Sequence, residues 1–207
     1  MADTNNDTTN DRYNEADRTR IEMFLAHLDD VTGGIEPRFF PVATTHEGLN
    51  GVTAVVYSEV PEPGYIMAVT YGLSLATHPQ WTLGKPELCV CVESVDANWA
   101  LAVAFIAEQM RGECPFLYGD MLDFGGPMSE ESTMSSLVFF APAVLEPVDY
   151  LNIDVGDELP INIVGCYPIH DEERLYIAEH GLEQFWEQAW DPFDVMREPA
   201  LGQPPAP

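Results

Sequence analysis

Basic residues are scarce in this chain of 207 residues, which has eight Lys and Arg against 35 Asp and Glu. The only lysine is Lys85, and the formal net charge is −27 at pH 7. A surface of this sign repels the phosphates of nucleic acids and anionic lipids, so the charge argues against binding to either class. It favours a basic protein as partner, although an organism with an acidic proteome would give the same total.

Long apolar runs and paired cysteine motifs are also absent. No uncharged apolar stretch approaches the roughly 20 residues that a membrane span needs, and the N-terminus lacks the basic start and apolar block of a secretion signal. The four cysteines lack the CxxC pairs typical of a zinc site; they are Cys89, Cys91, Cys114 and Cys166. We therefore expect a soluble, cytoplasmic protein with small buried thiols in a reducing compartment, and no metal or cofactor.

The stretch from Pro86 to Asp120 predicts a buried strand, a helix and an aromatic loop. Its strand has apolar residues at both alternating sets of positions, from Leu88 to Val92, so we expect it to be covered on both faces. The helix is expected to be capped by Asp96 or Asn98 and to end at Gly112 with Arg111 in its last turn. Its packed face is predicted to consist of Trp99, Ala102, Val103, Ile106 and Met110.

The remaining patterns predict an α+β fold: a mixed, largely antiparallel sheet with helices packed on it. The expected order is a helix (14–31), a meander of three strands (39–43, 52–60, 65–73), the central strand and helix, an irregular loop (114–132), a strand (134–141), a short strand (151–153), a strong strand (159–167) and a final helix from His170 that breaks at Gly181. The predicted organisation is a disordered leader (1–10), one domain (11–198) and a flexible Pro-rich tail (199–207).

Catalytic arrangements are weakly indicated. Asp120 and Asp123 could form a carboxylate pair for acid–base work or for a divalent ion, but the stretch lacks the alternate oxygens and the closing glutamate of a calcium loop. Cys166 and His170 remain a possible nucleophile and base, although the thiol lies in an apolar strand. Phosphate-binding loops, GxSxG and HExxH are missing, so no catalytic residue is assigned. Three tryptophans at helical spacing are expected to be core: Trp99, Trp186 and Trp190.

Several segments, taken in order, resemble the Suppressor-of-fused (SUFU) domain over roughly residues 38–199. They are YIMAVTYGLSLA, PELCVCVES, the helix with Trp99, FLYGD, LPINIVGCYPIHDEERLYIAEHGLEQFWE and FDVMREP. The most specific are VTYGLS, the Gly-Asp after Tyr118, and the junction from Cys166 to Glu173. The resemblance implies a non-enzymatic protein-binding domain of SUFU-like α+β type.

What the family does depends on its branch. Animal members hold a transcription factor of the Hedgehog pathway in the cytoplasm with the help of a second lobe, for which this chain is too short. Stand-alone bacterial members are associated with polymorphic toxin systems and resemble immunity proteins that neutralise a cognate toxin. The resemblance therefore implies an immunity protein in the bacterial cytoplasm.

Charge distribution suggests where such a partner would bind. From Gly112 to Glu173 there are thirteen acidic residues and no Lys or Arg, and most of these acids must face solvent. A basic toxin would be attracted to this surface, with aromatic side chains as anchors. The candidate partner-binding residues are Tyr118, Asp120, Asp123, Phe124, Glu130 and Glu131. A regulatory scaffold for another basic partner and a hydrolase that uses carboxylates or Cys166 are the alternatives, and the oligomeric state is open.

Overall fold

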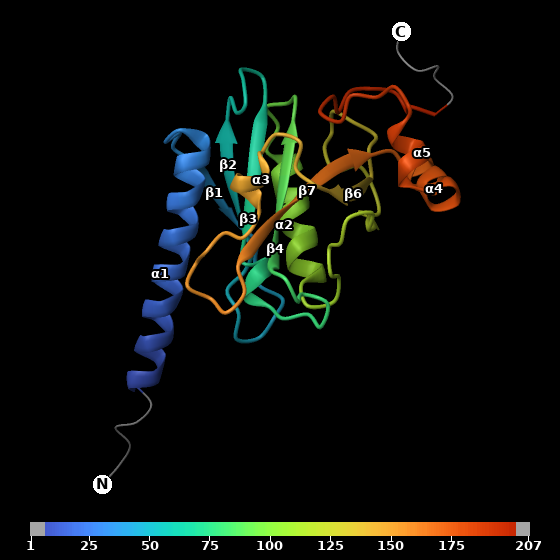
Figure 1. Cartoon of the computed structure of the whole chain (residues 1–207). Coiled ribbons are helices and arrows are strands. Elements are labelled where there is room, and N and C mark those ends of the chain that lie inside the picture. The colour runs from blue at the N-terminus through green and yellow to red at the C-terminus, as the bar shows by residue number, and fades with distance from the viewer. Residues whose placement is uncertain (1–6, 202–207) are drawn as a thin grey trace.

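A computed structural model describes residues 7–201 of the chain (Figure 1). Its elements are α1 (Asp7–Thr32), β1 (Arg38–Pro41), β2 (Thr53–Ser58), β3 (Ile66–Tyr71), the 3-10 helix η1 (Leu73–Leu75), β4 (Lys85–Val92), α2 (Asn98–Met110), β5 (Met121–Asp123), β6 (Ser136–Phe140), α3 (Pro147–Tyr150), β7 (Ile161–Ile169), α4 (Asp171–His180) and α5 (Leu182–Trp186). Of the expected leader and tail, residues 1–6 and 202–207 lie outside the described residues. The first helix begins at Asp7, earlier than expected, and Ala200 is buried.

The strands form one sheet of seven in the order β1-β2-β3-β4-β7-β6-β5. The meander from β1 to β3 is antiparallel, as expected, and β4 continues it. The β5-β6-β7 unit is antiparallel as well. Among the strands of residues 7–201, only β4 and β7 run parallel, since α2 and the β5–β6 hairpin intervene before the chain returns to the centre of the sheet. The prediction of a mixed, largely antiparallel α+β sheet is therefore confirmed.

Helices cover the sheet on both faces. α2 packs on the face of Leu88, Val90 and Val92, while Phe24 and Leu28 of α1 pack on the other face with the β4 cysteines. Residues 86–92 of β4 are all buried, so the prediction of a strand covered on both sides is confirmed. All four cysteines are buried free thiols. Within residues 7–201, no helix has the length and apolar character needed to cross a bilayer.

The last helices differ from the expected core pattern. Gly181, with φ of 90°, separates α4 from α5 as predicted. Ile177 and Phe185 are buried against β6 and β7, but Leu175 and Trp186 are exposed, so the expectation that Trp186 is core was wrong. The reason is that this helix pair lies at the β6–β7 end of the sheet and packs on it along one side only (Figure 1).

The ends of α2 also differ from expectation. Its N-cap position is Ala97, which lacks a side chain that can cap; Asp96, one residue earlier, accepts a hydrogen bond from the Asn98 N–H at 3.0 Å. Arg111 at the other end is fully buried and donates to the carbonyl oxygens of Asn50 (2.8 Å) and Gly72 (3.1 Å). The arginine thus cross-links two loops to the helix and is more than an exposed complement to the helix dipole.

Candidate functional site

The VTYGLS motif surrounds a buried carboxylate. Glu87 of β4 has no exposed surface, and it accepts hydrogen bonds from the Thr70 hydroxyl (2.6 Å), the Gly72 N–H (2.9 Å) and both the N–H (3.0 Å) and hydroxyl of Ser74. Burial raises the pKa of Glu87, and these hydrogen bonds offset only part of that rise. Arg20 of α1 donates to the same serine hydroxyl at 2.8 Å. The motif therefore joins β3, η1, β4 and α1, which is a structural role.

Glu108 is a second buried carboxylate. It accepts the N–H groups of Thr45 (2.7 Å) and Val52 (3.0 Å), and it pairs with Arg111 at 3.2 Å. Burial acts to raise its pKa, but these hydrogen bonds, the contact with His46 and the arginine charge together lower the pKa of Glu108 below its ordinary value. This carboxylate fixes the loop before β2 against the end of α2.

Glu173 is a third, and it explains two more of the quoted segments. It accepts the His170 N–H (2.9 Å), closing the capping box of α4, and the Ala200 N–H (2.8 Å). It also pairs with both terminal nitrogens of Arg197, at 2.5 and 2.9 Å. The junction at the end of β7 therefore supplies the carboxylate, and the FDVMREP segment the arginine, of one buried ion pair.

In neither candidate catalytic pair do the two side chains share a hydrogen bond; each bonds to other groups among the described residues. The Cys166 thiol is buried, and burial raises its pKa well above the ordinary value, which disfavours a thiolate. The His170 ring contacts the Thr133 hydroxyl at 3.3 Å and the Arg197 carbonyl oxygen at 3.1 Å. Among residues 7–201, no group of three or more His, Cys, Asp or Glu side chains is arranged to hold a metal ion.

The two aspartates each close a turn of their own. Asp120 accepts the Leu117 N–H at 2.8 Å, and Asp123 accepts the Gly125 N–H, also at 2.8 Å. In the same turn, the Gly119 N–H donates to the Phe139 carbonyl oxygen at 2.8 Å. The Gly-Asp of FLYGD therefore anchors the turn to β6 and holds the side chains of Leu117 and Tyr118 outward, where both are exposed.

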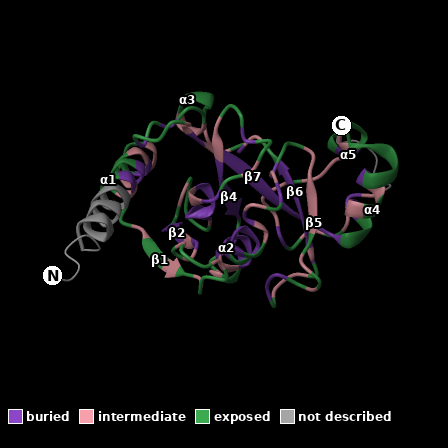
Figure 2. Cartoon of the chain, turned by 90° about the horizontal axis from the view of Figure 1, so that it is seen from below, coloured by how far each residue is buried: buried purple, intermediate pink, exposed green. Residues whose placement is uncertain are grey.

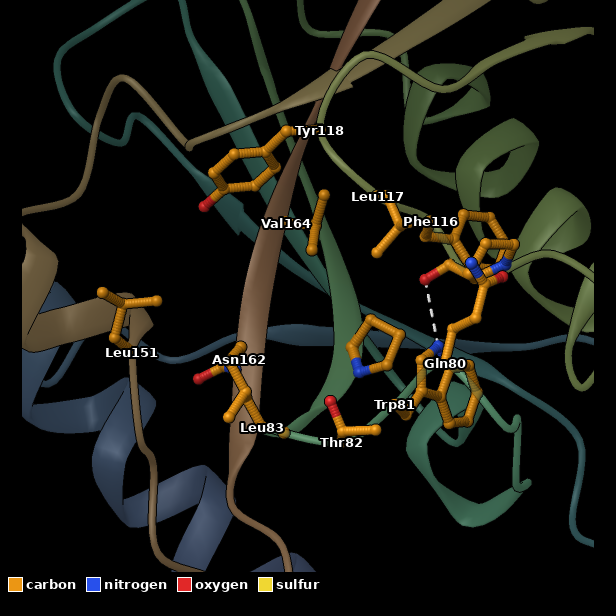
Figure 3. A pocket seen from close by; sticks show the side chains of 13 residues that line it. Gln80, Trp81, Thr82, Leu83, Phe116, Leu117, Tyr118, Leu151, Asn162 and Val164 are labelled. Atoms are coloured by element: carbon orange, nitrogen blue, oxygen red, sulfur yellow. Dashed lines mark hydrogen bonds between the residues drawn. The ribbon is translucent and has the colours of Figure 1, made fainter.

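Those two side chains border an apolar groove of about 360 Å³ at the end of the sheet where β4 and β7 begin (Figure 3). It is built from the loop before β4, the loop after α2, the first half of β7 and the residue after α3. The described residues that line it include no charged side chain. Its main apolar contributors are Trp81, Leu83, Leu117, Tyr118, Leu151 and Val164.

Two local features shape the groove. The Trp81 indole N–H donates to the Pro115 carbonyl oxygen at 3.0 Å, which ties the two wall loops together. Gly84 lets the loop lie directly on β7, because a Cβ there would come within 2.2 Å of the Asn162 amide nitrogen. Figure 3 shows Leu117 and Leu151 on either side of β7, so the first half of this strand forms the floor.

The groove walls are apolar and open to solvent. Leu83 is 83% exposed, Tyr118 49%, Leu117 44% and Leu151 38%. These exposed apolar side chains offer a partner molecule surface to bury. Sequence reasoning identified Tyr118 and Asp120 here but missed Leu83 and Leu151. The signal available for Leu83 was an apolar residue next to a loop glycine and the only lysine.

The other candidate residues lie in different surroundings. Phe124 packs edge-on against Phe105 of α2, with ring centroids 6.0 Å apart, and Asp123 is exposed on the edge strand β5. Glu130 is exposed in the following loop, while Glu131 accepts hydrogen bonds from the Trp99 indole N–H (2.7 Å) and the Ser94 hydroxyl. The structure therefore places Tyr118 at the groove with Asp120 in its supporting turn, and the other four outside the groove lining.

The thirteen acids do not form one face. All except Glu173 are at least partly exposed, as expected from their number. They extend from α3 to α4, which lie far apart in Figure 2. The acids are therefore spread widely over the surface, and none of the thirteen lines the groove.

The model of the Suppressor of fused protein (SUFU) family matches residues 46–198, most of the chain. The chain belongs to the Suppressor of fused family. The groove lies within the matched range, whereas α1 precedes it. The comparison with curated protein sequences gives no match.

Solved SUFU structures share the fold. A SUFU homolog from Neisseria gonorrhoeae is 19% identical with a TM-score of 0.68, over 88% of this chain and 97% of that one. The Sufu–Fu complex gives 11% identity and a TM-score of 0.65, over 86% and 91% of the two chains. Drosophila Suppressor of Fused gives 13% and 0.61, over 87% of this chain but 50% of the fly protein. These similarities confirm a SUFU-like α+β domain.

Proposed function

We propose that this SUFU-like domain is a protein-binding immunity protein, which neutralises a cognate basic toxin of a polymorphic toxin system in the bacterial cytoplasm. The observation that carries the binding role is the apolar groove between Leu83, Leu117 and Leu151. One structural neighbour is the Sufu–Fu complex, a SUFU protein together with a partner. The sequence resemblance to stand-alone bacterial members supports the immunity role.

The energetics favour a protein partner at this groove. Burying exposed leucine and aromatic side chains stabilises a complex, and a few such anchors at the centre of an interface carry most of its binding energy. The net charge of −27 adds long-range attraction for a basic protein and speeds association. Groove and charge therefore have separate roles: the groove holds the partner, and the acidic surface steers it.

A regulatory scaffold that sequesters another basic protein would use the same groove. The gene neighbourhood separates the two roles, because an adjacent toxin gene favours immunity. The hydrolase alternative loses support from Cys166, since burial raises its thiol pKa.

The test is complex formation with the protein encoded next to this one, together with protection of cells that express that protein. We expect the double variant Leu83→Asp, Leu117→Asp to lose both. Val95→Asp is the matched control, because Val95 is 82% exposed and lies beyond the opposite end of β4 from the groove. The control should bind and protect like the unmodified chain.

Two outcomes contradict different parts of the proposal. If the folded double variant still binds and protects, the groove is not the binding site. If the unmodified chain neither binds nor protects, the immunity role is wrong.

A further inference from the structure

Three exposed aromatic rings form a continuous row that starts at the groove. The rings of Tyr118 and Phe140 lie 5.0 Å apart between centroids, and those of Phe140 and Trp186 lie 5.4 Å apart. They come from the turn after α2, the end of β6 and the end of α5. Phe140 is 36% exposed and Trp186 is 40% exposed, so the row presents ring surface to solvent along its length.

Neighbouring aromatic side chains hold Trp186, at one end of the row, in place. Trp186 meets Tyr167 edge-on at 5.8 Å and Trp190 at 5.2 Å. Its neighbour Phe185 is fully buried and fixes α5 on the sheet. The exposed indole is therefore preorganised, which reduces the entropy lost when a ligand stacks on it.

The surroundings of Trp186 are acidic. Glu183 precedes it by three residues on α5, hence on the same side of the helix, and Glu187 follows it; both are exposed. The nearest basic side chains in sequence are already paired: Arg174 with Asp171 at 2.6 Å, and Arg197 with Glu173. These two arginines are therefore already engaged and do not complement the row.

The protein itself shows which cation suits such a site. The Arg197 guanidinium lies 4.7 Å from the Trp190 ring centroid while its nitrogens bind Glu173. Arg20 lies 5.2 Å from the Tyr71 ring centroid while its Nε donates to Asp157 at 2.9 Å. In both cases an aromatic ring and a carboxylate hold one arginine. The exposed row offers the same two elements on the surface.

We propose that the row Tyr118–Phe140–Trp186 binds arginine side chains of a basic protein partner, with guanidinium groups stacked on Trp186 and Phe140 and paired with Glu183 or Glu187. Guanidinium is planar and weakly hydrated, so it stacks on an indole better than the compact ammonium of lysine does. The biological partner rests on the proposed function, but the preference for arginine is a property of this chain alone. The row thus deepens that function by naming the side chain that the partner supplies.

The test titrates the full chain with octa-arginine and octa-lysine, peptides of equal charge, at two salt concentrations. We expect octa-arginine to bind about fivefold more tightly, as one or two exposed cation–π contacts allow. Trp186→Ala should bring the two affinities to within about twofold, whereas Trp186→Phe should keep most of the difference. Val95→Ala, which changes neither the row nor the groove lining, should leave both affinities unchanged. The Trp186 indole N–H signal should shift in NMR spectra with octa-arginine.

Equal affinities for the two peptides would overturn the proposal, and so would an arginine preference that survives in folded Trp186→Ala. Glu183→Gln with Glu187→Gln should weaken both peptides, because the acids contribute charge and the rings contribute the choice of side chain. The failures are distinguishable. If the toxin complex depends on Leu117 but the chain shows no preference for octa-arginine, the proposal for the aromatic row is wrong and the immunity role is unaffected. If the chain prefers octa-arginine but binds no toxin, the immunity role is wrong and the proposal for the aromatic row is unaffected.

Discussion

This acidic chain buries three of its carboxylates but exposes several apolar side chains at the groove. Glu87, Glu108 and Glu173 lie inside, each satisfied by hydrogen-bond donors of the chain itself. Leu83 and Leu117 lie outside, and their exposed surface faces solvent. The comparison shows that two of the quoted SUFU segments, VTYGLS and the junction from Cys166 to Glu173, form hydrogen bonds around buried carboxylates. The exposed apolar residues lie instead on loops that other contacts fix, among them the hydrogen bond from Trp81 to Pro115.

The largest effect is expected from Glu173→Ala. The change leaves Arg197, whose side chain is 8% exposed, without its counter-charge. Breaking a buried pair in this way costs about 3–5 kcal/mol of unfolding free energy. Urea denaturation measures it, with Asp171→Ala as the control, because its pair with Arg174 is partly exposed and is worth at most about 1 kcal/mol. Equal losses in both variants would show that the internal pair is not a structural cross-link.

The next prediction compares the loss of stability in two variants of buried carboxylates. Glu108→Gln leaves the Arg111 charge buried and should cost about 2–4 kcal/mol. Glu87→Gln should cost less, about 1 kcal/mol, because hydroxyl and N–H groups surround this carboxyl. Burial also raises the pKa of Glu87, which favours the neutral carboxyl that glutamine resembles. Thermal unfolding of the two variants gives the order. A larger loss for Glu87→Gln would contradict this assignment of charges.

Acid should act through Glu108. Although burial raises its pKa, the N–H bonds from Thr45 and Val52 and the contacts with His46 and Arg111 lower it below the ordinary value of 4.5. A pKa that is lower in the folded state contributes stability above the unfolded value, and that contribution is lost as pH falls through the folded value. We expect the urea concentration at the unfolding midpoint to decrease as the pH is lowered below about 4.5. In Glu108→Gln this decrease with pH should be less steep. An identical slope in the variant would rule out this residue as a cause.

Sequence patterns predicted the sheet and its central helix because alternation and helical spacing record burial directly. They did not predict that Glu87, Glu108 and Glu173 are buried, since the donors that make burial tolerable come from other elements; Thr45, for example, is 63 residues away from Glu108. Trp186 was misassigned because helical spacing does not reveal that α5 packs along one side only. Leu151 was missed at the groove because its exposure depends on where α3 and β7 meet.

The smallest effect is expected at the acids outside the groove. Glu130→Lys should change the unfolding free energy by less than about 0.5 kcal/mol, since its side chain is exposed. Asp123→Lys should cost about 1 kcal/mol, because it also removes the hydrogen bond from the Gly125 N–H. Both variants should slow association with a basic partner severalfold at low salt and have little effect at high salt. Stopped-flow mixing measures this. Glu131 is unsuitable for the same test, because it accepts the Trp99 indole hydrogen bond. A large rise in dissociation rate would move the binding site from the groove to these residues.

Hydrogen–deuterium exchange of the chain, with and without its bound partner, tests the groove assignment most directly. We expect new protection at residues 80–84 and 116–118 and around Leu151, with the loop at 123–131 unchanged. Protection confined to residues 123–131, with the groove loops exchanging as in the free chain, would contradict the account.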